Sequence, residues 1–88
     1  MKTYKYNPRD FEAFPALDAE MEDFYRLLEV YHQDKTSSNW FRLDKQRRDL
    51  FFSIKHRVVE GSITESTAQE LRDYFGELFD GEGNYDKL

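Results

Sequence analysis

The chain has 88 residues, a formal net charge of −5 and no cysteine, and aromatic residues make up 17% of it. The lack of cysteine excludes a disulfide framework and a thiolate metal site. No apolar run approaches the roughly 20 residues of a membrane span, and residues 1–6 do not resemble a secretory signal, so we expect a cytoplasmic protein that does not enter a membrane.

The length predicts a single domain over residues 1–88. A chain of this size buries about 60–65% of the surface that it exposes when unfolded, so its many aromatic side chains must supply much of the core. Residues 1–15 are expected to form an N-terminal arm, in which Asn7 and Pro8 predict a capped helical turn that carries Phe11 and Phe14.

The first helix is predicted for residues 16–34, with Pro15 at its start. Its apolar residues recur at spacings of four, three, four and three, as expected for one face of a helix. They are Leu17, Met21, Phe24, Leu28 and Tyr31.

Two further helices are predicted, for residues 39–60 and 64–80. Ser38 or Asn39 is expected to cap the second helix, Gly61 to end it, and Thr64 to cap the third. The expected inner faces are Trp40, Leu43, Leu50, Phe51, Ile54 and Val58 on the second helix and Ala68, Leu71, Phe75, Leu78 and Phe79 on the third. Residues 81–88 are interpreted as a mobile acidic tail. The predicted fold is an all-α three-helix bundle with an N-terminal aromatic segment or short extra helix packed across it.

Charge is distributed unevenly along the chain. Residues 1–34 carry four Lys or Arg against eight Asp or Glu, residues 35–60 carry seven against three, and residues 61–88 carry two against seven. This acidic, basic, acidic order places the positive charge on the second helix and leaves both neighbouring helices acidic.

The second helix carries a further stripe, well away from its expected inner face, in which apolar and basic residues alternate. We call it the mixed stripe, and it consists of Phe41, Lys45, Arg48, Phe52, Lys55 and Val59. In one interpretation the flanking helices cover it, and their carboxylates pair with its cations. In the other it is an exposed protein-binding surface, with Phe41 and Phe52 as anchors and Arg48 as a fork for carboxylates.

Carboxylates on the first and third helices form a second candidate binding surface, which we call the acidic surface. It consists of Glu22, Asp23, Glu29, Glu70, Asp73 and Glu77. Negative helix faces of this kind can mimic a phosphate backbone, as in inhibitors encoded by phages and mobile elements. Small acidic helical immunity proteins are similar in size and charge, although their paired tyrosines before a proline are missing here.

Motifs for chemistry are missing from the sequence, and we predict no catalytic residue, metal ligand or cofactor. His32 and His56 lie on different predicted helices and are not at metal-ligand spacing. The second and third helices resemble a helix-turn-helix in outline, but the third helix carries four carboxylates against one arginine, which opposes binding to phosphates.

The sequence therefore predicts a non-enzymatic, acidic helical protein that binds another protein as a regulator or inhibitor, and a bacterial, phage or mobile-element source is our hypothesis. The alternative is a nucleic-acid-binding accessory module that uses Lys45, Arg48, Lys55 and Arg57. A homodimer that contacts through the mixed stripe is a third hypothesis.

Overall fold

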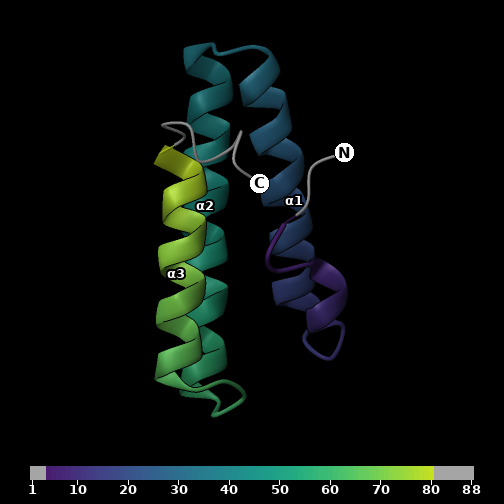
Figure 1. Cartoon of the computed structure of the whole chain (residues 1–88), viewed down its shortest axis with the longest axis vertical. Helices are drawn as coiled ribbons and strands as arrows, with labels where there is room; N and C mark the ends of the chain where they lie inside the picture. The colour runs from purple at the N-terminus through teal and green to yellow at the C-terminus, as the bar shows by residue number, and fades with distance from the viewer. Residues whose placement is uncertain (1–3, 81–88) are drawn as a thin grey trace.

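The computed structural model describes residues 4–80, which form three antiparallel helices and one short helical turn (Figure 1). The helices are α1 (Pro15–Gln33), α2 (Ser37–Val59) and α3 (Glu65–Asp80), and the turn is η1 (Pro8–Phe11). Over this described part no strand occurs. The predicted all-α three-helix bundle is confirmed, and the predicted tail, residues 81–88, lies outside the described residues.

The starts of α2 and α3 follow from capping side chains. Thr64 caps α3 as predicted, since its hydroxyl accepts the Thr67 backbone N–H at 3.1 Å. Helix α2 begins two residues earlier than predicted, because Thr36 is the cap and accepts the Asn39 backbone N–H at 3.1 Å. Asn39 lies inside the first turn, and its side-chain amide donates to the backbone oxygen of Asp34 at 2.8 Å.

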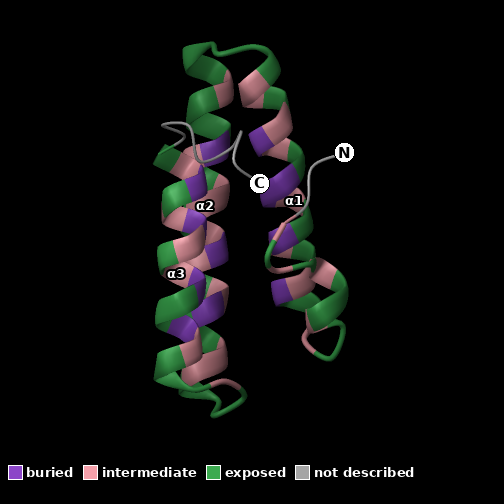
Figure 2. Cartoon of the chain, in the orientation of Figure 1, coloured by how far each residue is buried: buried purple, intermediate pink, exposed green. Residues whose placement is uncertain are grey.

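The core is a single apolar cluster to which all three helices contribute (Figure 2). Most of the residues expected to face inward are fully buried, and rings connect the two outer helices. The Phe75 ring of α3 lies 5.3 Å from the Phe24 ring and 5.6 Å from the Tyr25 ring, both of α1. The fully buried large side chains are Leu17, Met21, Phe24, Leu43, Leu50, Ile54, Leu71, Phe75 and Leu78.

The N-terminal segment connects α1 to α3, as the predicted packing of an aromatic arm across the bundle requires. The Tyr4 ring stacks on the Tyr25 ring of α1 with 3.9 Å between centroids, and the Tyr25 hydroxyl donates to the backbone oxygen of Tyr6. On the other side, the Lys5 backbone N–H donates to the Tyr74 hydroxyl of α3 at 2.9 Å. The arm therefore contributes to the fold as a strap between the outer helices.

Candidate functional site

The mixed stripe of α2 lies on the side of the helix turned away from the core. The side chains at its apolar positions are largely in solvent, with exposed fractions of 63% for Phe41, 73% for Phe52 and 76% for Val59. Large aromatic side chains cost free energy when they remain in water. The structure thus leaves this stripe uncovered by α1 and α3, in contrast to the interpretation in which the flanking helices bury it.

The cations of the mixed stripe are also exposed, and two of them pair along their own helix. Lys45 Nζ lies 3.3 Å from Asp49 Oδ2, and Arg48 Nη2 lies 3.1 Å from Asp44 Oδ2. The Lys45 and Arg48 side chains keep exposed fractions of 77% and 66%, and Lys55 is exposed as well. The expected pairing of Lys45 and Arg48 with carboxylates of the neighbouring helices is therefore replaced by pairing within α2.

Two arginines of α2 point the other way and contribute to packing. The Arg47 guanidinium lies 4.6 Å from the centroid of the Phe79 ring, and the Arg57 guanidinium lies 5.8 Å from that of Phe14. Arg57 also pairs with Glu60 at 3.2 Å, and its side chain is only 15% exposed. Arg57 thus packs near the C-terminal end of α2. It is separate from the three exposed cations with which the sequence grouped it for nucleic-acid binding.

Trp40 extends the exposed aromatic surface at the start of α2. The sequence assigned it to the core, but 37% of the residue is exposed. Its ring lies 5.3 Å from the Phe41 ring and 5.5 Å from the Phe79 ring of α3. Trp40 shares its helical phase with Val58 of the expected inner face, so the phase does not indicate this partial exposure.

The acidic surface is interrupted by the N-terminal arm. The Tyr4 hydroxyl donates to Glu29 Oε1 on α1, and the Tyr6 hydroxyl donates to Glu70 Oε2 on α3, each at 3.4 Å. The arm lies between these two carboxylates and donates a hydrogen bond to each of them. The six residues consequently do not form one uninterrupted negative face.

Two other members of the acidic surface have neighbours on their own helices. Asp23 pairs with Arg26 of α1 at 3.2 Å, and Asp73 accepts from the side-chain amide of Gln69 on α3 at 2.8 Å. Such contacts at spacings of three and four are ordinary for exposed helix faces and contribute only a few tenths of a kcal/mol, about 0.2–0.5 each.

Tyr4 of the arm and two helix tyrosines near it, Tyr25 and Tyr74, resist ionisation. Burial, and after it the neighbouring Glu29, raises the pKa of Tyr4 to about 12. Burial likewise raises the pKa of Tyr25 and Tyr74, although the Lys5 backbone N–H that donates to Tyr74 acts in the opposite direction. Sequence reasoning missed this cluster, because no local spacing connects Tyr4 and Tyr6 to residues so far along the chain.

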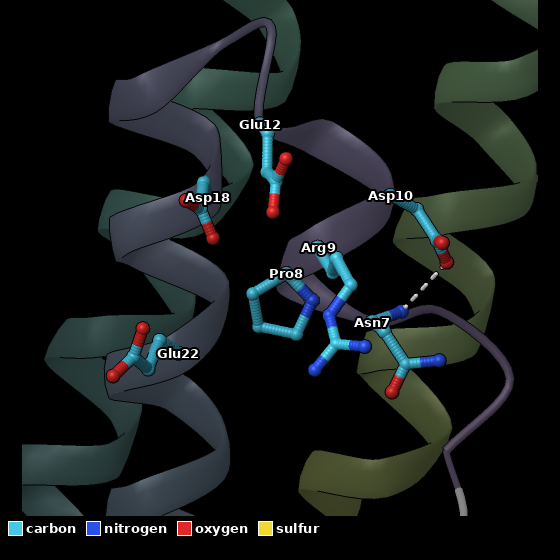
Figure 3. A pocket seen from close by; sticks show the side chains of 7 residues that line it. All are labelled: Asn7, Pro8, Arg9, Asp10, Glu12, Asp18 and Glu22. Carbon is cyan, nitrogen blue, oxygen red and sulfur yellow. Dashed lines mark hydrogen bonds between the residues drawn. The ribbon is translucent and has the colours of Figure 1, made fainter.

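A polar hollow of about 610 Å³ lies between η1 and the beginning of α1 (Figure 3). Inside it the Asn7 backbone N–H donates to Asp10 Oδ2 at 3.1 Å, and Arg9 is the single cation among four carboxylates. Pockets for small molecules are lined predominantly by apolar and aromatic groups, whereas most side chains that line this hollow are charged. Its lining is Asn7, Pro8, Arg9, Asp10, Glu12, Asp18 and Glu22.

The described residues, 4–80, contain neither a cluster of metal ligands nor a membrane-spanning helix. No three His, Cys, Asp or Glu side chains of that range approach one another closely enough to hold a metal ion. His56 pairs with Glu60 at 3.0 Å on the exposed end of α2. None of the described helices is both long and apolar enough to cross a bilayer.

Comparison of the chain with protein families, with curated proteins and with solved structures found no match.

Proposed function

We propose that this chain is a non-enzymatic cytoplasmic protein that binds another protein through the mixed stripe of α2 and thereby regulates or inhibits it. The observation that supports this proposal is the exposure of Phe41 and Phe52 beside three exposed cations on one helix face. Interface anchors are typically aromatic residues and arginines, and a small domain gains nothing for its own stability by placing phenylalanines in water.

The electrostatics of the mixed stripe favour an acidic protein as the partner. Lys45, Arg48 and Lys55 lie between the apolar positions. A bound surface must therefore place negative groups near these cations, because burying them unpaired costs free energy. A single-stranded nucleic acid would also supply negative charge. Of the four cations that the nucleic-acid hypothesis groups, three remain exposed once Arg57 is excluded, which gives few phosphate contacts.

Photo-cross-linking tests the proposal most directly. A photoreactive phenylalanine at position 52 should form covalent adducts with a protein in cells of the source organism, and these adducts should persist after nuclease treatment. The same group at position 69, an exposed position on α3, is the control and should not give these adducts.

Truncation of the anchors gives a quantitative test with the captured partner. Phe41→Ala and Phe52→Ala should each weaken binding, by roughly 30-fold where the side chain is a hot spot worth about 2 kcal/mol. Val30→Ala removes an exposed apolar side chain from α1 and should leave affinity unchanged. Adducts that consist only of nucleic acid, or equal binding by all three variants, would refute the proposal.

A further inference from the structure

The mixed stripe has the spacing of a coiled-coil seam. Its residues recur at intervals of four, three, four, three and four from Phe41 to Val59, all within the helical range of α2. Residues at these intervals line the contact edge between two helices that lie side by side with knobs-into-holes packing of their side chains. At 1.5 Å per residue the seam is about 27 Å long, comparable to the length of a partner helix of five turns.

Charge opposes a second copy of this chain as the occupant. In the antiparallel register that places Phe41 against Val59, Lys45 of one copy meets Lys55 of the other. In a parallel pair in register, each cation faces the same cation of the other copy. The remaining seam positions give no compensation, because the antiparallel register brings Arg48 of one copy against Phe52 of the other.

The cations of the seam are available for carboxylates from outside. The pairs Lys45–Asp49 and Arg48–Asp44 join exposed cations to residues one turn away on the same helix. Exposed pairs of this kind are weak, so an external carboxylate replaces either of them at little cost.

We propose, resting on the function proposed above, that the occupant of the mixed stripe is an amphipathic helix of another protein with Asp or Glu opposite the three cations. Its apolar residues lie opposite Phe41, Phe52 and Val59, which are separated by eleven and seven residues on α2. The heptad spacing specifies a helix, and the cations between the apolar positions specify its charge.

Two synthetic helical peptides serve as probes. Both carry Leu at the positions opposite the three apolar residues of the seam, and one has Glu and the other Lys opposite the three cations. We expect the native protein to bind the Glu peptide at least tenfold more tightly than the Lys peptide in fluorescence anisotropy. The variant Lys45→Glu/Arg48→Glu/Lys55→Glu should reverse this preference, and its circular dichroism and melting temperature verify that it folds.

Equal affinity for the two peptides, or no reversal in the variant, would overturn the helix inference. Tighter binding to anionic phospholipid vesicles or to single-stranded polynucleotide than to the Glu peptide would overturn it as well. Cross-linking at position 52 separates the two proposals: protein adducts together with equal peptide affinities leave the protein-binding function intact and refute only the helical, acidic partner. When protein adducts are also missing, the binding function itself fails.

Discussion

Replacement of Gly61 and of Gly76 by alanine should have opposite effects on stability, although both glycines lie beside open space. Gly61 follows α2 with φ of +81°, in the left-handed region, and Gly76 lies inside α3. A Cβ at either position would meet no atom within 4 Å. Gly61→Ala should therefore destabilise the protein by about 1–2 kcal/mol through backbone strain alone.

Gly76→Ala is the matched variant and should stabilise the protein by up to about 1 kcal/mol, because alanine is the better helix former. Chemical denaturation of the two variants and the native protein measures both effects. Equal and small effects at the two positions would contradict the left-handed conformation at Gly61.

The strap formed by the N-terminal arm should make stability depend on alkaline pH. Tyr4 loses its proton near pH 10.0 in the unfolded chain, whereas the folded protein holds its pKa at about 12. Its contribution to stability is fully present below pH 10 and is lost as the pH rises from 10 towards 12. The unfolding free energy, measured by denaturation at about pH 9 and pH 11, should fall over this interval.

Tyr4→Phe tests which group is responsible. This variant keeps the ring that stacks on Tyr25 and removes the ionisable hydroxyl, so its stability should fall less steeply above pH 10. A slope identical to that of the native protein would assign the alkaline loss to Tyr25 and Tyr74 alone, whose pKa values are also raised.

Helix periods could be predicted from the sequence far better than helix caps or the path of the arm. The apolar spacing on each helix identifies the buried face, but Thr36, Ser38 and Asn39 are all good caps, and the sequence does not rank them. The arm could not be placed, because its ring contacts and hydrogen bonds join residues that no periodicity connects. The Lys5–Tyr74 bond, for example, spans 69 residues.

The helical phase of the mixed stripe could be predicted from the sequence, whereas its exposure required the structure. Helical phase places Phe41 and Phe52 opposite Leu43 and Leu50, yet a central helix can be covered on both sides. Phase also indicates that Arg47 lies close to the inner face, where it packs on Phe79. Helical phase could thus distinguish the cations that pack on the bundle from the exposed ones. Grouping the cations by their position along the chain missed this difference.

At the scale of the whole molecule, the three exposed cations of the mixed stripe should keep the protein monomeric. Lys45→Leu/Arg48→Leu/Lys55→Leu would convert the stripe into an apolar seam with heptad spacing, and we expect this variant to dimerise or aggregate. Sedimentation velocity over a dilution series measures the change. The Lys45→Glu/Arg48→Glu/Lys55→Glu variant is the control and should remain monomeric, because it keeps like charges on the seam.

A native protein that dimerises at low micromolar concentration, and loses this behaviour on Phe52→Ala, would instead assign the mixed stripe to self-association. In that case the expected reversal of peptide preference would also fail, since the seam would already be occupied.

The strap between α1 and α3 has a consequence for the order of assembly. A ribosome makes the arm before its partners on α3, and the hydrogen bonds from Lys5 to Tyr74 and from Tyr6 to Glu70 span 69 and 64 residues. Contacts of such separation close the largest loops, while α1 and α2 can pair as a hairpin as soon as both have emerged. For this segment the order of synthesis and the order of folding are reversed, because the arm is translated before α3 and acquires these contacts only after α3 has emerged.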